Sequence, residues 1–278
     1  MIMNSRRRSK GIEQVILVTG ASSGIGKATA EHLAARGHRV FAGARRPDAV
    51  SLLHGAHPVQ LDVTDDASVS AAVSSILATA GRIDVLVNNA GSSILGAVEE
   101  TSIDQARSLF ETNVLGVLRM SQAVLPAMRR QRAGRIVNVS SVVGFLPAPY
   151  MGVYAASKHA IEGLSESMDH EVRGFGVRVV VVEPSFTRTN IDQASPRAEH
   201  PLDDYAVQRE RAADSIGRQI ANSPQPAVVA QVIAEAIDAP GFKRLPVGSR
   251  AAQLSRVRKW MPASMVDTAL RKSFSLDS

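Results

Sequence analysis

The sequence predicts one α/β domain, built as a doubly wound parallel sheet with helices on both faces. Apolar runs rich in β-branched residues, such as residues 15–19, alternate with stretches of helical periodicity. No proline- or glycine-rich linker divides the 278 residues, of which 45% are hydrophobic, enough for one substantial core. No run of about twenty apolar residues occurs, so we expect no transmembrane helix.

The elements follow one another in the order that this fold class requires. Residues 15–19 predict a strand that runs through a glycine-rich turn into a helix at residues 27–36, and a second strand follows at residues 39–43. Further β-branched runs predict strands at residues 85–87, 135–139 and 177–182. Helical periodicity predicts helices at residues 67–79, 103–130, 153–173 and 227–239. This alternation favours parallel strands joined by crossover helices.

The turn after the first strand has the spacing G-x-x-x-G-x-G, with Gly20, Gly24 and Gly26. Glycines let the backbone approach a pyrophosphate closely, and the N-terminus of the following helix offers free N–H groups and a partial positive charge. Strand, turn and helix together predict a Rossmann-type dinucleotide site. An ordinary strand-to-helix turn is the alternative for the glycines taken alone.

The end of the second strand predicts which dinucleotide binds. An acidic residue there would bond the ribose 2′-hydroxyl of NAD, but the sequence has Arg45 and Arg46, and the first carboxylate is Asp48. Because guanidinium groups pair well with a 2′-phosphate, we expect NADP(H), with Arg45 in direct contact. Arg46 either stacks on the adenine or stays in solvent.

Tyr154 and Lys158 are four residues apart in a predicted helix, and therefore lie on one face. A free phenol has a pKa of about 10, and a neighbouring cation lowers that pKa by favouring the phenolate. The pair is a candidate general acid and base. Such pairs also occur by chance on helix surfaces, so this interpretation depends on the other motifs.

Taken together, the motifs resemble those of the short-chain dehydrogenase/reductase family over residues 15–190, with a pattern similar to its hydroxysteroid- and retinol-dehydrogenase-like members. They occur in the family's order with compatible spacing. The motifs are Thr19-Gly20-Ala-Ser-Ser-Gly24-Ile-Gly26, Leu61-Asp62-Val63, Asn88-Asn89-Ala90-Gly91, Asn113, Ser140-Ser141, and Tyr154 with Lys158. One departure is Ser185, which follows Pro184 where the family usually has glycine.

The resemblance implies a set of NADP(H) contacts. Asp62 would meet the adenine amino group, Asn89 and its neighbours would shape the cofactor floor, and Thr189 would bond the nicotinamide carboxamide. The implied contact residues are Gly20, Ser22, Ser23, Gly24, Ile25, Gly26, Arg45, Asp62, Val63, Asn89, Ala90, Gly91, Tyr154, Lys158, Pro184, Thr187 and Thr189.

The resemblance also implies hydride transfer between NADP(H) and the carbonyl or secondary alcohol of a small molecule. Tyr154 would exchange the proton, and Ser141 would hydrogen-bond the substrate oxygen. Lys158 would lower the pKa of the tyrosine and bond the ribose, and Asn113 would hold a relay water. The family's spacing to the tyrosine points to Ser141, and Ser140 would replace it if the intervening loop were shifted by one residue.

The sequence therefore predicts an NADP(H)-dependent oxidoreductase, acting on a hydrophobic molecule because the apolar segment 145–151 precedes the tyrosine. The alternative is a catalytically silent NADP(H)-binding sensor, which could lose Tyr154 or Lys158 without penalty. The chain has no cysteine, and the pair His54 and His57 lacks a carboxylate neighbour, so we expect no metal. Family analogy implies a homodimer or homotetramer, and the lack of a signal-peptide pattern predicts a cytoplasmic protein.

The formal net charge of +6 arises at the two ends of the chain. Residues 1–11 predict a basic disordered tail, residues 12–248 the catalytic domain, and residues 249–278 a basic helical extension of that domain, divided by Pro262. Because the basic residues do not share one predicted face, we expect no nucleic-acid partner. The extension packs on its own fold or a neighbouring subunit, or makes a peripheral contact with anionic lipid.

The segment after Thr189 is expected to set substrate specificity. Residues 190–201 are polar, and a helix is predicted from residue 202 or 203 to residue 222. We expect this segment to form a mobile flap over the site, and a plain surface helix is the alternative.

Overall fold

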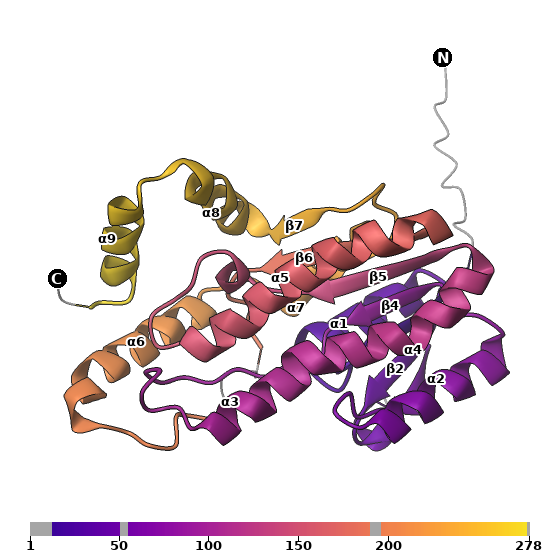
Figure 1. Cartoon of the computed structure of the whole chain (residues 1–278), viewed down its shortest axis with the longest axis horizontal. Coiled ribbons are helices and arrows are strands. Elements are labelled where there is room, and N and C mark those ends of the chain that lie inside the picture. The colour runs from indigo at the N-terminus through magenta and orange to yellow at the C-terminus, as the bar shows by residue number, and fades with distance from the viewer. Residues whose placement is uncertain (1–12, 51–54, 190–195, 277–278) are drawn as a thin grey trace, which may run out of the picture.

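The computed structural model describes residues 13–50, 55–189 and 196–276 (Figure 1). Its centre is a seven-stranded sheet in the order β3-β2-β1-β4-β5-β6-β7, with every neighbouring pair parallel. The strands are β1 (Val15–Thr19), β2 (Arg39–Ala44), β3 (Ala56–Gln60), β4 (Val85–Asn88), β5 (Gly134–Val139), β6 (Val177–Pro184) and β7 (Arg244–Val247). The strand order reverses between β1 and β4, which opens a crevice at their carboxyl ends. The prediction of a doubly wound α/β fold is confirmed.

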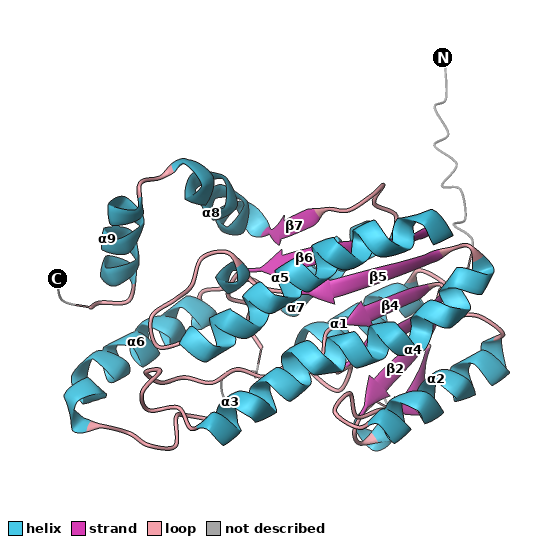
Figure 2. Ribbon diagram, viewed as in Figure 1, coloured by secondary structure: helices cyan, strands magenta, loops and turns pink. Residues whose placement is uncertain are grey.

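Helices cover both faces of this sheet (Figure 2). α1 (Gly24–Ala35) and α7 (Pro226–Ile237) pack on one face, and α2 (Asp66–Ala80), α4 (Gly116–Gln131) and α5 (Gly152–Val172) pack on the other. Side chains alternate along a strand, so Ile16 and Val18 lie in the first core while Val15 and Leu17 lie in the second. Both faces of β1 are buried, which explains why its sequence is a continuous apolar run.

The predicted helix at residues 103–130 is divided into three segments. α3 (Ile103–Phe110) leads into a π-helix at Glu111–Leu115, and α4 follows it. The π-helix holds Asn113, whose side chain is only 1% exposed. Short π-helical turns often occur at functional sites. A π-helical turn closes its hydrogen bonds one residue further along than an α-helical turn, and this small difference leaves the overall apolar pattern intact. Periodicity alone therefore predicted one uninterrupted helix.

The apolar patterns alone did not predict the two edge strands, although the family resemblance implies a strand end at residues 61–63, next to β3. β3 contains His57 and Pro58 and is largely exposed, and β7 contains Pro246. Proline cannot donate to a strand ladder and is therefore found on sheet edges. Both segments lack the continuous apolar run that identifies the five inner strands.

Three helices that follow β6 build the end of the molecule beyond the carboxyl ends of the strands. They are α6 (Asp203–Ala221), α8 (Gly248–Trp260) and α9 (Ala263–Ser273), and Pro262 separates the last two as predicted. Phe274, just after α9, shares an apolar cluster with Ala212 and Ile216 of α6. The predicted basic tail at residues 1–11 and residues 190–195 of the predicted flap lie outside the described residues.

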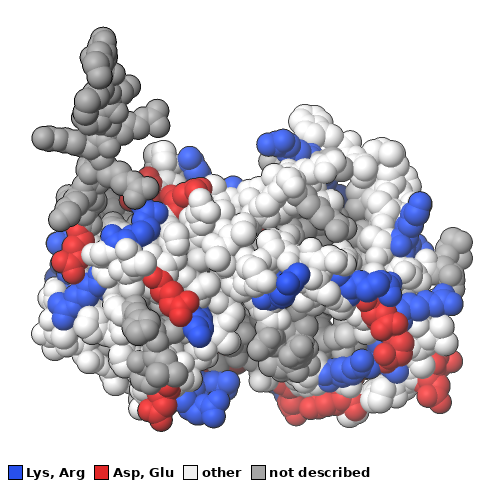
Figure 3. All heavy atoms as spheres, turned by 180° about the vertical axis from the view of Figure 1, so that it is seen from behind, with Lys and Arg blue, Asp and Glu red and all other residues white. Residues whose placement is uncertain are grey.

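Charges of both signs are interspersed over the face turned away from the viewer in Figure 1, as Figure 3 shows. The described residues of that face therefore present no single-sign field of the kind that attracts a polyanion. Within the described ranges, no helix combines the length and the hydropathy needed to cross a bilayer.

Candidate active site

The turn between β1 and α1 requires its three glycines. Gly20 and Gly24 have φ angles of 66° and 54°, in the left-handed region that favours glycine. A Cβ on Gly20 would lie 2.8 Å from Cα of Ala90, and one on Gly26 would lie 2.3 Å from the carbonyl oxygen of Gly20. Ser23, the N-cap of α1, makes no side-chain capping bond. The turn therefore brings the backbone and an uncapped helix N-terminus to the crevice, as a pyrophosphate site needs.

Thr19 and Asn89 lock this turn to the end of β4. The buried Oγ1 of Thr19 accepts hydrogen bonds from the backbone N–H groups of Asn89 and Ala90, both at 3.0 Å. Nδ2 of Asn89 donates to the carbonyl oxygens of Thr19 and Gly20, at 3.0 and 3.2 Å. The threonine at the end of β1 thus holds the floor of the crevice in place.

The end of the crevice beside β2 and β3 is polar and carries charges of both signs. Arg45 follows β2 directly, is exposed, and lines the cleft, whereas Arg46 does not line it. Oδ1 of Asp62 accepts bonds from the backbone N–H and the hydroxyl of Thr64, at 2.9 and 2.8 Å. The backbone bond from Thr64 is the main cause that lowers the pKa of Asp62, with Arg45 contributing a smaller attraction.

Tyr154 and Lys158 lie one turn apart on α5, as predicted from their spacing. The Lys158 ammonium nitrogen lies 5.7 Å from the centroid of the Tyr154 ring. That nitrogen also donates to the carbonyl oxygen of Val139 at 3.0 Å, and the residue is only 7% exposed. Burial lowers the pKa of Lys158 to about 8, against the attraction of Glu162, which raises it. The fold thus holds the Lys158 ammonium beside the Tyr154 ring, in a buried position where the lysine loses its proton more easily than in water.

Asn113 joins the π-helix to the cleft floor and to α5. Its Nδ2 donates to the carbonyl oxygen of Ser92 at 2.9 Å and to Oγ of Ser157 at 3.0 Å, while Oδ1 accepts from the backbone N–H of Ser92 at 2.9 Å. A Cβ on Gly91 would lie 3.2 Å from Oδ1 of Asn113 and 3.8 Å from Nζ of Lys158. Asn113 and Lys158 therefore both lie close to the point where a side chain on Gly91 would begin.

The two candidate serines have different surroundings. Ser141 is half-buried at the cleft, and its Oγ accepts from the backbone N–H of Val143 at 3.3 Å and donates to the carbonyl oxygen of Pro184 at 3.4 Å. Ser140 is 3% exposed, and its Oγ has no hydrogen-bond partner among the described residues. A Cβ on Gly144 would lie 2.6 Å from that oxygen, so the Ser140 hydroxyl is directed toward the turn behind the cleft. This geometry favours Ser141 as the serine that meets a ligand.

The segment after β6 returns to the glycine turn. Oγ1 of Thr187 donates to the carbonyl oxygen of Ser185 at 3.1 Å, and a Cβ on Gly24 would lie 3.3 Å from Cγ2 of Thr189. Ser185 is not among the residues with positive φ, so its backbone conformation does not require the family's glycine. The departure from the family pattern thus leaves the local backbone unstrained.

One continuous cleft of about 1520 Å³ brings these residues together at the carboxyl ends of the strands. It is larger than the roughly 300–1,000 Å³ of a typical small-molecule site, which leaves room for a dinucleotide and a second molecule. All but two of the predicted site residues line it. The exceptions are Gly26, packed beneath Gly20, and Asn113, buried behind Gly91.

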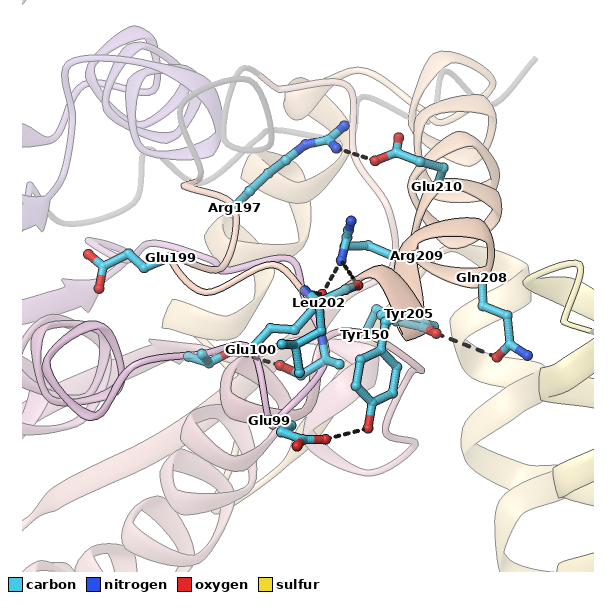
Figure 4. A network of polar contacts seen from close by, with 12 residues as sticks. Glu99, Glu100, Tyr150, Arg197, Glu199, Leu202, Tyr205, Gln208, Arg209 and Glu210 are labelled. Carbon is cyan, nitrogen blue, oxygen red and sulfur yellow. Dashed lines mark hydrogen bonds and ion pairs between the residues drawn. The ribbon is translucent and has the colours of Figure 1, made fainter.

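A network of polar contacts that the sequence did not reveal anchors residues 196–202 beside the cleft (Figure 4). The carboxylate of Glu100, 0% exposed, pairs with Arg209 and accepts from the backbone N–H of Leu202 at 2.9 Å. Arg197 pairs with Glu210 at 2.5 Å, and the Tyr205 hydroxyl donates to Glu99 at 2.7 Å. The described part of the predicted mobile flap is therefore fastened to the segment after β4.

Fold and site together define a class of protein, the oxidoreductases that use a dinucleotide to act on alcohol and carbonyl groups. The family model for short chain dehydrogenases matches residues 14–200, and the chain belongs to that family.

Relatives cover nearly the whole chain. A 3-ketodihydrosphingosine reductase from Bacteroides thetaiotaomicron is 37% identical, over 95% of this chain and 98% of its own length. A short chain dehydrogenase/reductase from Burkholderia phymatum, solved in complex with NAD, is 28% identical with a TM-score of 0.78, over 89% of this chain and 93% of its own. A short chain dehydrogenase from Burkholderia cenocepacia, solved in complex with NADP, is 25% identical with a TM-score of 0.75. The match covers 95% of this chain and 98% of that one.

Proposed function

We propose that this protein is an NADP(H)-dependent oxidoreductase that interconverts a carbonyl and a secondary alcohol on a hydrophobic small molecule. The observation that carries the proposal is the single cleft in which a glycine-rich phosphate turn at one end meets Tyr154, Lys158 and Ser141 at the other. The cradle fits a dinucleotide, because the β1–α1 turn lines the cleft and the N-terminus of α1 has no side-chain cap. When bound, the cofactor supplies or accepts the hydride.

The protein's own residues position the substrate oxygen and handle its proton. In the reductive direction, Tyr154 donates its proton to the oxygen as negative charge develops there. Ser141 donates a hydrogen bond to the same oxygen and holds it in place. The Lys158 ammonium favours the phenolate that Tyr154 leaves behind. Lys158 then passes a proton to that phenolate, and a water beside Gly91, in the segment that Asn113 orders, replaces the proton that Lys158 has lost.

The preference for NADP(H) rests on Arg45. This guanidinium follows β2 at the cleft, where a ribose 2′-phosphate would lie, and Arg pairs bidentately with phosphate. The relatives solved with cofactors hold either NAD or NADP. The cofactor preference therefore depends on this chain's own residue rather than on the family.

The apolar lining supports a hydrophobic substrate. Leu146, Ala148 and Met151 line the cleft before Tyr154, and Leu270 and Phe274 line it from the C-terminal end. The relative named a 3-ketodihydrosphingosine reductase acts, by its name, on a ketone. We infer reduction of a ketone with an extended apolar body as the reaction to test first.

The test is fluorescence titration with NADPH and NADH, followed by NADPH consumption against a panel of long-chain ketones, steroids, quinones and aldehydes. We expect NADPH to bind at least about tenfold more tightly than NADH, and Arg45→Ala to remove most of that difference while Arg46→Ala keeps it. Turnover of a panel member supports the enzyme. Tight NADPH binding without turnover of any member would favour a cofactor sensor, and an NADH preference would contradict the role of Arg45.

A further inference from the structure

The end of the cleft beyond Tyr154 has one apolar wall and one polar wall. The apolar wall comes from residues 145–151 and α9. The polar wall is one side of α6, because its lining residues recur every three or four positions. These residues are Ser215, Arg218, Gln219 and Asn222.

The polar wall offers hydrogen-bond donors that the described residues do not use. Nε2 of Gln219 is buried and has no hydrogen-bond partner among them. Arg218 of α6 and Arg258 of α8 both line the cleft as exposed cations. Neither forms an ion pair within the described part of the chain. A buried donor without an acceptor is destabilising unless a ligand completes the bond. This wall therefore fits a group made of acceptor oxygens.

Acidic residues do not offset these cations. Among the described residues that line the cleft, the single carboxylate is Asp62, which lies at the opposite, adenine end. A cleft lined by charges of one sign attracts ligand groups of the other sign. A cationic substrate group would meet two guanidinium groups here and no counter-charge from the described lining.

We propose that Arg218, Gln219 and Arg258 form a subsite for an anionic group, a carboxylate or phosphate, at the far end of the substrate. The substrate is then an anionic amphiphile. Its apolar body lies along α9, its carbonyl meets Tyr154, and its anion pairs with the guanidinium groups. The substrate class rests on the proposed function, whereas anion binding at this wall does not depend on turnover.

The test uses three matched ketones, 9-oxodecanoate, its methyl ester and 10-aminodecan-2-one, with shorter and longer homologues of each. NADPH consumption gives kcat and KM for the wild type, Arg218→Ala and Arg258→Ala. We expect kcat/KM for the acid to exceed that for the amine by about tenfold or more. Each variant should raise KM for the acid about fivefold or more and leave the ester within about twofold. Lys272→Ala, which removes a cation of α9 outside the cleft lining, is the control for general charge.

A second readout needs no reaction. Calorimetric titration of the NADPH-saturated protein compares decanoate, decanol and decylamine, and we expect decanoate to bind most tightly and to weaken in both arginine variants. A preference for the amine, or equal effects of the variants on all three ketones, would overturn the subsite. The subsite would also be overturned if Arg218→Ala and Arg258→Ala weakened NADPH binding and left the preference for the acid over the amine unchanged. If no ketone is reduced, the proposed function fails, and the decanoate titration still decides the subsite.

Discussion

At the scale of single residues, the charge of Lys158 depends on Glu162, a carboxylate that Arg244 holds in turn. Glu162, one turn further along α5, attracts the ammonium and raises its pKa against the larger effect of burial. Arg244 of β7 holds the same carboxylate through Nε at 2.9 Å, and it pairs with Glu166 at 2.8 Å. The ammonium itself donates to the neutral carbonyl of Val139. The pKa of about 8 lies close enough to neutrality for Glu162 or Arg244 to change the lysine's charge.

Glu162→Gln and Arg244→Gln should move the pH profile in opposite directions. Catalysis needs the ammonium, so kcat/KM should fall as pH rises through the pKa of Lys158, about 8. Loss of Glu162 removes an attraction and moves this fall to lower pH, by about one unit. Loss of Arg244 removes the cation that partly neutralises the Glu162 carboxylate. Glu162 then attracts the Lys158 ammonium more strongly, so the fall in kcat/KM moves to higher pH. The measurement is kcat/KM for a ketone between pH 6 and about 10.

Glu166→Gln is the matched control, because it removes the exposed partner of Arg244 and leaves Glu162 in place. Its profile should stay close to that of the wild type. Shifts of the same sign in Glu162→Gln and Arg244→Gln would show that these residues act only by maintaining the fold.

The sequence predicted the tyrosine and the lysine because their spacing is local. It could not predict Arg244 as a partner, since this residue lies 82 positions from Glu162 and meets it only once β7 has joined the sheet. The buried Oε1 of Glu162 has no hydrogen-bond partner among the described residues, and no pattern in the sequence indicates that.

At the scale of elements, the β1–α1 turn tolerates no side chain at its third glycine. In Gly26→Ala, the new methyl group would lie 2.3 Å from the carbonyl oxygen of Gly20 and 2.4 Å from Nδ2 of Asn89. We expect unfolding free energy to fall by about 1–3 kcal/mol and NADPH affinity to fall with it. Urea unfolding and NADPH titration measure the two effects.

Gly163→Ala is the comparison, because this glycine lies within α5 with no atom within 4 Å of an added Cβ. That variant should be more stable by about 0.5–1 kcal/mol and should bind NADPH normally. Equal behaviour of the two variants would mean that the turn is not closely packed.

The anchor of residues 196–202 makes a separate prediction for Glu100→Gln. Burial would raise the pKa of Glu100, but bonds from the N–H groups of Leu202 and Ala97 and the charge of Arg209 together lower it. The variant leaves Arg209 without its buried counter-charge, which should cost about 3 kcal/mol of stability. KM for the ketone should rise while the dissociation constant of NADPH stays the same, and an effect confined to NADPH would contradict this account.

The same carboxylate gives the anchor a dependence on pH. Because the folded pKa of Glu100 lies below its ordinary value of 4.5, its stabilising effect is complete above that value and is lost as pH falls through the folded pKa. Urea unfolding of the wild type should show this loss below pH 4.5, and Glu100→Gln should lack that part of it.

Sequence patterns predicted the inner elements well and the edges poorly. The inner strands are buried on both faces, so each is a continuous apolar run, whereas β3 and β7 carry prolines and exposed positions. The π-helix at Asn113 and the anchor at Glu100 depend on contacts between segments. For Glu100, those contacts reach across about a hundred residues, to Leu202 and Arg209.

At the scale of the whole molecule, NADPH should stabilise the fold because its cleft spans most of the chain, from β1 to α9. A ligand at one hundred times its dissociation constant adds about 2.7 kcal/mol of stability, which should raise Tm by roughly 5–10 °C for a chain of this size. Arg45→Ala should lose most of this rise with NADPH and keep the smaller rise with NADH. Thermal unfolding at matched cofactor concentrations measures both.

In the proposed reaction, Tyr154 transfers the proton in a cleft that does not need the tyrosine hydroxyl to bind NADPH. The most direct measurement is single-turnover oxidation of bound NADPH by a ketone that the wild type reduces, in Tyr154→Phe and in Tyr205→Phe, whose lost hydroxyl bonds Glu99 in the anchor. We predict that Tyr154→Phe keeps its NADPH affinity and loses about a hundredfold or more in rate, while Tyr205→Phe stays near the wild type. A Tyr154→Phe protein that reduces the ketone at the wild-type rate would contradict the account.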